Sequence, residues 1–138
     1  GLYKVRGLTR KASSDKARML RMMGVEIIQG DFADHKSIKA ACQGAYGIFC
    51  ALPLANDYSA QVVDGIRIVD EAFAANVHFF ALSSMADVTA ASERRITDVI
   101  FADAIAQIER YVRSREFPAH AIIRKGWFLE NLFDVAKP

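Results

Sequence analysis

Five short, largely apolar segments alternate with amphipathic segments along the chain, and this alternation constrains the fold more than any other feature. The apolar segments span residues 3–9, 25–29, 46–52, 77–83 and 119–123. Between them, apolar side chains recur every three or four residues, which is the spacing of one helix face. Strands that are almost continuously apolar are typical of parallel sheets covered by helices. We therefore predict an α/β fold, a doubly wound parallel sheet with helices on both faces.

Capping residues mark where the helices between these strands begin and end, because serine and aspartate favour helix starts and glycine favours helix ends. The predicted helices run from Ser13–Ser14 to Gly24, from Asp34 to Gly44, from Asn56 or Asp57 to about Phe73, and from about Asp98 to Arg115. The first of these helices carries an apolar stripe of Ala17, Leu20 and Met23. A polar loop is expected ahead of the last helix.

The composition is that of an ordinary globular domain, with 52% apolar and 25% charged residues and a net charge of +2. This charge is too small to indicate a nucleic-acid or membrane partner. Cys42 and Cys50 lie among apolar residues, which favours buried free thiols in a reducing compartment. No apolar run is long enough to span a bilayer. We expect a protein located in the cytoplasm, with the nucleus as an alternative location. We also expect no metal site.

The residues that follow each strand are the candidate binding residues, because open parallel sheets bind ligands beyond the carboxyl ends of their strands. Thr9, Arg10 and Lys11 follow the first strand. If this strand is the second of a dinucleotide-binding fold, the two cations suit the 2′-phosphate of NADP, where a carboxylate would suit NAD. The alternative is a pair of ordinary surface cations.

The ends of the later strands add polar and apolar candidates. Asp31 offers an acceptor to an adenine amino group, and the ring of Phe32 is suited to flank adenine. The apolar segment 52–54 is suited to lie against a flat heterocycle, and Ser83–Ser84 supplies hydroxyls. Each also has an ordinary structural interpretation, as turn, strand or cap. The predicted cofactor-binding residues are Thr9, Arg10, Lys11, Ser14, Asp31, Phe32, Leu52, Pro53, Leu54, Ser83, Ser84, Phe128 and Asn131.

Three segments resemble successive motifs of a known family. They are KVRGLTR at 4–10, GVEIIQGD at 24–31 and FLEN at 128–131. In this order they resemble the NmrA-like family, whose members are atypical relatives of the short-chain dehydrogenases. The resemblance covers essentially the whole chain and implies an NADP-binding Rossmann domain. Some members sense redox state or co-regulate transcription, and relatives reduce quinones or plant phenolics.

The resemblance also implies where each part of the cofactor lies. Arg10 and the residues from Lys11 to Ser14 face the 2′-phosphate, and Asp31 and Phe32 border adenine. Residues 52–54 line the middle of the cofactor, and 128–131 approach the nicotinamide end.

The chain departs from the family pattern at both ends and at two internal positions. It opens on the second strand of the fold, without the first strand and the G-x-x-G-x-x-G turn that holds the pyrophosphate. In the strand order 3-2-1-4-5-6 the missing strand is central, and its absence leaves two strand edges unpaired. The family continues beyond residue 138. Ile105 stands where many members have lysine, and Lys125 replaces a proline. We therefore expect residues 1–138 to form one partial NAD(P)-binding domain.

No catalytic set is recognisable in the sequence. Short-chain dehydrogenases use a tyrosine and a lysine four residues later. The residues four positions after Tyr3, Tyr46, Tyr58 and Tyr111 are Gly7, Cys50, Val62 and Arg115. Tyr111 with Arg115 comes nearest, and we interpret Tyr111 as a core-facing ring at the far end of its helix.

Three hypotheses about function follow. The first is a regulatory module that senses NADP or NADPH and passes that state to a protein partner. The second is a fragment of an NADPH-dependent reductase, similar to quinone or isoflavone reductases. The third is a truncated product that binds cofactor weakly.

Overall fold

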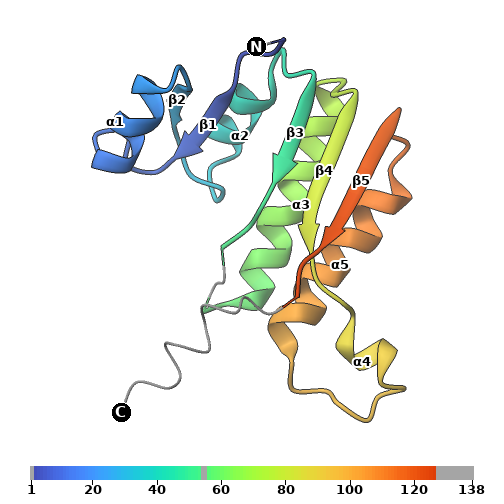
Figure 1. Cartoon of the computed structure of the whole chain (residues 1–138). Coiled ribbons are helices and arrows are strands. Elements are labelled where there is room, and N and C mark those ends of the chain that lie inside the picture. The colour runs from blue at the N-terminus through green and yellow to red at the C-terminus, as the bar shows by residue number, and fades with distance from the viewer. Residues whose placement is uncertain (1, 54–55, 127–138) are drawn as a thin grey trace, which may run out of the picture.

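Parallel strands and helices alternate along the chain as the sequence predicts. The computed structural model describes residues 2–53 and 56–126 of the 138. Its elements are β1 (Arg6–Thr9), α1 (Asp15–Met22), β2 (Glu26–Gln29), α2 (His35–Cys42), β3 (Gly47–Cys50), α3 (Tyr58–Ala74), β4 (Phe79–Ser84), α4 (Val88–Ala91), α5 (Ile100–Ser114) and β5 (Ala119–Arg124) (Figure 1). The predicted α/β, Rossmann-like class is confirmed.

The strands form two separate parallel groups rather than one sheet. β1 pairs with β2, and β3, β4 and β5 form a three-stranded sheet with β4 in the middle. Among the described residues, no strand pairs with the other edge of β1 or of β3. Figure 1 shows these two edges on either side of an interval that no strand fills. In a 3-2-1-4-5-6 sheet, the strands that correspond to β1 and β3 flank the central strand. The five strands therefore keep the order expected of such a sheet on either side of its central position.

One face of the three-stranded sheet carries the hydrophobic core. Figure 1 shows α3 and α5 behind these strands, and α2 packs against α3. Phe80 and Leu82 point from β4 into this layer and meet Val69 of α3 and Ile108 of α5, all fully buried. Burying side chains of this size stabilises the fold by about 1.5–3 kcal/mol each. The core therefore lies between β4 and the helices α3 and α5.

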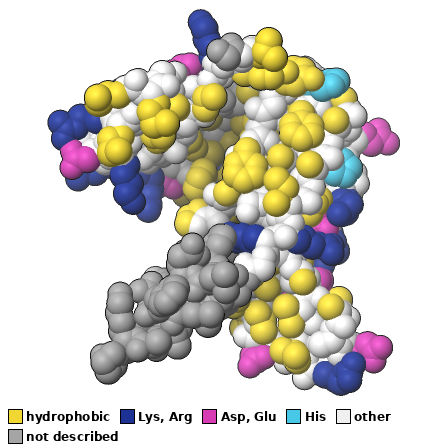
Figure 2. All heavy atoms as spheres, in the orientation of Figure 1, with side chains coloured by type: hydrophobic (Ala, Val, Ile, Leu, Met, Phe, Trp, Pro, Cys, Tyr) yellow, Lys and Arg dark blue, Asp and Glu magenta, His cyan; other side chains and the backbone are white. Residues whose placement is uncertain are grey.

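The opposite face of the same sheet is open. Phe49 on β3 is 64% exposed and Ile123 on β5 is 51% exposed, and Figure 2 shows hydrophobic side chains gathered over these strands. The first helix is similarly open. Of its predicted apolar stripe only Ala17 is buried, while Leu20 and Met23 are exposed, since no described element packs on their side of α1.

The capping predictions are confirmed at most helix ends. Ser14 caps α1 by accepting the N–H of Ala17 at 3.2 Å, and Asp34 and Asp57 cap α2 and α3 in the same way. Gly24 and Gly44 follow their helices with φ of 86° and 71°, in the region that favours glycine. Two details differ from the prediction. The polar loop contains the one-turn helix α4, and α5 begins at Ile100 without a side-chain cap.

Both cysteines are buried free thiols, as predicted. Burial raises the pKa of Cys42 to about 11 and that of Cys50 to about 12. No described helix is long and apolar enough to cross a membrane.

Candidate functional site

The end of β1 presents two cations without acidic partners. Arg10 and Lys11 are exposed, and no carboxylate in the described part of the chain forms an ion pair with either. Nearby arginines differ, because Arg6 pairs with Glu26 at 3.3 Å and Arg18 pairs with Asp15. An unpaired arginine keeps its donors for a phosphate, which it can bind through two parallel hydrogen bonds.

The ends of β1 and β2 are joined, which brings their candidate residues to one edge. Thr9 is the register partner of Gln29, and its carbonyl accepts the N–H of Gly30 at 3.0 Å. The next residue, Asp31, accepts the N–H of Ala33 at 3.1 Å through Oδ1 and so closes the turn into α2. Ser14 lies close in sequence, but its hydroxyl oxygen caps α1.

A small cavity lies where β2, β3 and α3 meet. Its volume is about 150 Å³, and its lining residues are Phe32, Leu52, Pro53, Asp57, Ala60, Gln61 and Asp64. The structure thus brings together Phe32, Leu52 and Pro53, three residues from the predicted set that are up to 21 positions apart in sequence. An apolar cavity of about this volume accommodates a single aromatic ring.

Arg67 of α3 fixes the Phe32 wall of this cavity. Its Nη1 donates to the carbonyl oxygen of Phe32 at 2.8 Å and to Oδ1 of Asp64 at 2.5 Å. The backbone of the β2–α2 turn is therefore tied to the helix that forms the opposite wall, which keeps the cavity's shape.

Gln61, which also lines this cavity, is a buried polar residue that sequence reasoning missed. It lies one turn into α3 and is 4% exposed. Its Nε2 donates to the carbonyl oxygen of Pro53, whereas its Oε1 is buried and has no hydrogen-bond partner within the described residues. Buried polar atoms are nearly always paired, so an unpaired one requires an explanation.

The ends of β4 and β5 are joined through a buried carboxylate. Glu109 of α5 is 3% exposed and accepts the Ser84 hydroxyl at 2.7 Å and Arg124 Nη2 at 2.7 Å. Arg113 donates to it at 3.0 Å. Hydrogen bonds from Arg124, then from Ser84 and Arg113, outweigh burial and lower the pKa of Glu109 to about 2. The Ser84 hydroxyl therefore donates its hydrogen bond to Glu109 inside the protein. Its neighbour Ser83, the other predicted serine, is half-buried.

The tyrosine nearest to a catalytic pattern lies away from this edge. Tyr111 packs against the core, and its hydroxyl donates to Asp70 at 2.7 Å, which is the main reason its pKa is raised. Arg115 stacks over the Tyr111 ring at 4.8 Å and also pairs with Asp70. The prediction of a core-facing ring is confirmed. Ile105 is 5% exposed and belongs to the core.

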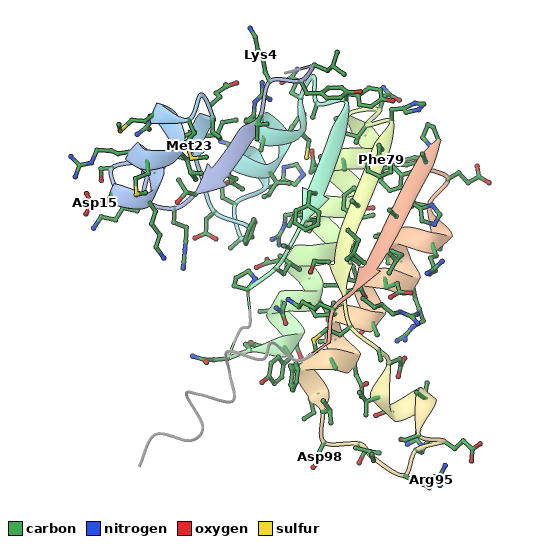
Figure 3. The ribbon with its side chains drawn as sticks, viewed as in Figure 1. Lys4, Asp15, Met23, Phe79, Arg95 and Asp98 are labelled. Atoms are coloured by element: carbon green, nitrogen blue, oxygen red, sulfur yellow. The ribbon has the colours of Figure 1, made fainter. Side chains whose placement is uncertain are left out.

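A second, wider cavity of about 740 Å³ lies between the start of α3, α4 and the start of α5. Its carboxylates have protein partners. Asp103 accepts the Val88 N–H at 2.8 Å and the Thr89 hydroxyl at 2.5 Å, and Asp87 pairs with Arg110. Figure 3 shows Arg95 and Asp98, from the connection between α4 and α5, at the end of the molecule opposite Lys4 and Phe79. Three predicted cofactor residues, Leu54, Phe128 and Asn131, lie outside the described residues.

Comparison with known proteins gives a consistent result. The sequence profile of the NmrA-like family matches residues 2–138. The NmrA-like family domain-containing oxidoreductase hkm9 of Aspergillus hancockii is 31% identical over 136 residues, and the match covers 94% of this chain and 40% of that protein. The corresponding oxidoreductase lnaB of Aspergillus flavus is 32% identical over 138 residues, with 94% and 40% covered. The chain thus spans about 40% of the length of these relatives.

Solved structures share the fold. The triphenylmethane reductase of Citrobacter sp. complexed with NADP(H) superposes with a TM-score of 0.78 at 21% identity, over 92% of this chain and 41% of that one. The NADPH-dependent quinone oxidoreductase QOR2 of Escherichia coli, complexed with NADPH, gives 0.75 at 21% identity, over 95% and 42%. At these identities the likeness establishes the fold alone.

Proposed function

This chain belongs to the NmrA-like family, and from that premise we propose that it is the NADP(H)-binding part of an NADPH-dependent reductase. In this proposal residues 1–138 are one portion of a nucleotide-binding domain, and the substrate region lies elsewhere in the protein. The relatives that are named oxidoreductases support the reductase assignment over the sensor hypothesis.

The observation that carries the proposal is that β1 ends in two cations while the adjacent strand β2 leads into a small cavity. Arg10 and Lys11 follow β1 without acidic partners among the described residues, and Phe32 follows the adjacent strand and lines the cavity. Phosphate and adenine are joined through one ribose in NADP, so a site for it needs both features close together.

The residues present fit this cofactor. Arg10 and Lys11 would hold the 2′-phosphate, and Phe32, Leu52 and Pro53 would flank the adenine. When bound, NADPH supplies a hydride to a substrate. The chain's own residues bind and orient the adenosine half, which is far from that chemistry.

One observation favours the redox-sensor hypothesis as a second candidate. At the position where many family members have lysine, this chain buries Ile105 in its core. The pair that comes nearest to a catalytic tyrosine and lysine is Tyr111 and Arg115. Both of these side chains bind Asp70. A protein that binds NADP(H) and signals the redox state of the cofactor to a partner, without turnover, would need neither the lysine nor the tyrosine–lysine pair.

Turnover separates the two candidates. The product of the complete reading frame is mixed with NADPH and a panel of quinones, and the NADPH absorbance is followed. Sustained, enzyme-dependent oxidation is expected for a reductase. Tight NADPH binding without oxidation of any acceptor would overturn the reductase proposal in favour of the sensor.

A further inference from the structure

Ser13 is an exposed serine in the connection between β1 and α1. Residues 10–14 belong to no helix or strand, and the Ser14 N–H donates to the Lys11 carbonyl oxygen at 3.1 Å to close the turn around Ser13. The Ser13 hydroxyl has no hydrogen-bond partner within the described residues. The Ser14 hydroxyl, by contrast, is half-buried and caps α1 by accepting the Ala17 N–H. Of the two neighbouring serines, Ser13 is therefore the one whose hydroxyl can react.

The residues ahead of Ser13 form the pattern that one class of protein kinase reads. Arg10 and Lys11 stand three and two positions before it. Both are exposed, and neither pairs with a carboxylate in the described part of the chain. Kinases that select basic substrates bind such side chains through complementary acidic residues, and they transfer the γ-phosphoryl group of ATP. On the folded protein both cations are therefore accessible to such an enzyme.

The surroundings of the turn favour a phosphate group on Ser13. Arg21 of α1 donates through Nη1 to a backbone carbonyl oxygen of the turn at 2.8 Å, and Lys16 is exposed in the first turn of α1. Asp15, the acidic residue nearest in sequence, is paired with Arg18. Figure 2 shows Lys and Arg side chains gathered at the end of the molecule where α1 lies. A phosphoserine carries about −1.5 to −2 charges at pH 7 and binds such cations.

We propose that Ser13 is a phosphorylation site for a kinase of this class, and that its phosphate occupies the cations that the 2′-phosphate of NADP would use. In the reaction Ser13 Oγ bonds to the γ-phosphorus of ATP, ADP leaves, and the hydroxyl proton passes to the catalytic base of the kinase. The product places an anion within three residues of Arg10 and Lys11, so a second phosphate group there is repelled. The effect on binding rests on the proposed NADP(H) function, whereas the modification itself does not.

Kinase treatment tests the modification. The full chain is incubated with ATP and the catalytic subunit of cAMP-dependent protein kinase, and peptide mass spectrometry locates the phosphate. Thr97 stands at the same spacing from Arg94 and Arg95, so Thr97→Ala and Ser13→Ala are treated in parallel. We expect phosphate on Ser13 in wild type and in Thr97→Ala. A Ser13 without phosphate while a reference peptide is fully modified, or phosphate on Ser14 instead, overturns the site.

The role of the basic residues is tested with the same assay. Arg10→Ala is expected to slow the phosphorylation of Ser13 by about tenfold or more, because the kinase loses one charged contact. Arg18→Ala is the matched control, since that arginine is exposed but lies after the serine. An unchanged rate in Arg10→Ala would overturn the recognition pattern.

Binding of small nucleotides tests the effect of the phosphate. Calorimetry compares Thr97→Ala before and after kinase treatment, with adenosine 2′,5′-bisphosphate and adenosine 5′-phosphate, because neither nucleotide needs a pyrophosphate-binding loop. We expect phosphorylation of Ser13 to weaken binding of the bisphosphate by about tenfold or more and binding of the monophosphate by less than about twofold. Kinase-treated Ser13→Ala is the control and should bind both nucleotides as the untreated variant does.

The outcomes separate this inference from the function on which it rests. Equal weakening of both nucleotides, or none, in the fully phosphorylated chain overturns the competition between the two phosphates. If the untreated chain binds the bisphosphate no more tightly than the monophosphate, the NADP assignment fails and the competition fails with it. Phosphate found on Ser13 in that case still supports the modification site.

Discussion

The region of β1, α1 and β2 and the region of β3, β4 and β5 with α3 and α5 are built differently. In residues 2–29 Ala17 is the one fully buried side chain that the structure describes, whereas the second region holds most of the core. The first region has strands of four residues with one partner each, and in the second β4 has six residues and partners on both sides. The candidate phosphate-binding cations belong to the first region. Stability and cofactor selectivity are therefore assigned to different parts of the molecule.

The largest expected effect comes from emptying the core of the three-stranded region. Phe80 is fully buried and stacks on Phe117 at 5.1 Å. Phe80→Ala is expected to lower the free energy of unfolding by about 3–5 kcal/mol, measured by urea denaturation. Met22→Ala, at an exposed position in α1, is the control and should change it by less than about 0.5 kcal/mol. Equal losses would remove the contrast between the regions.

Hydrogen exchange sharpens the same contrast without mutation. The amide of Leu82 lies in the middle of β4, between β3 and β5. The amides of Glu26 and Gly30 lie in the two-stranded group, where they donate to the carbonyl oxygens of Val5 and Thr9. We expect Leu82 to exchange about 100-fold more slowly, because local opening of the smaller group breaks fewer buried contacts. Similar protection at the three positions would mean that both regions open as one unit.

A smaller, pH-dependent effect is expected at Glu109. Its pKa is about 2 in the folded state, below the value of about 4.3 in an unfolded chain. The ionised carboxylate therefore stabilises the fold fully at pH values above the unfolded-state pKa. The stabilisation is lost as the pH falls toward the folded-state pKa. Glu109→Gln should cost about 1.5–3 kcal/mol at pH 7, and the cost should shrink below about pH 4.

Unfolding curves of wild type and variant at pH 7, 4 and 2.5 measure this difference. Glu93→Gln is the matched control, because Glu93 is exposed and lies 3.9 Å from Arg95, where an ion pair contributes little. A cost at Glu109 that does not change with pH would show that its charge does not stabilise the fold.

The smallest effect concerns binding. Arg10→Ala is expected to reduce the preference for NADP over NAD by about tenfold, since only NADP offers the arginine a phosphate. Calorimetry with both cofactors on the product of the complete reading frame measures the ratio. Arg18→Ala, which removes an exposed arginine already paired with Asp15, should leave the ratio unchanged. The same result for Arg10→Ala would contradict the assignment.

The order and type of the elements could be predicted because their causes are local. Caps such as Ser14 and Asp34 act within three residues, and apolar spacing marks each helix. Strand lengths depend on neighbours instead. The first strand was expected over residues 3–9 but spans Arg6–Thr9, since β2 pairs only with those residues. The helix α4 is a single turn and left no periodic pattern to detect.

The candidate site also contains residues whose positions could be predicted from the sequence and residues whose roles could not. The proximity of Phe32, Leu52 and Pro53 could be predicted because the carboxyl ends of parallel strands lie on the same side of the fold. Gln61 and Glu109 were missed because each is one polar residue on an apolar helix face. Their roles depend on partners distant in sequence, such as Ser84, which is 25 positions from Glu109. A glutamine or glutamate at a buried position of an amphipathic helix was the available signal.

The buried thiols of Cys42 and Cys50 can report how fast parts of the native protein open. Only thiolates react with alkylating reagents, and with pKa values of about 11 and 12 both cysteines are almost wholly protonated near pH 8. Alkylation must therefore wait until α2 or β3 opens and the side chain meets water. Because the two cysteines lie on different elements, their separate modification rates, followed by mass spectrometry, would time the opening of each element.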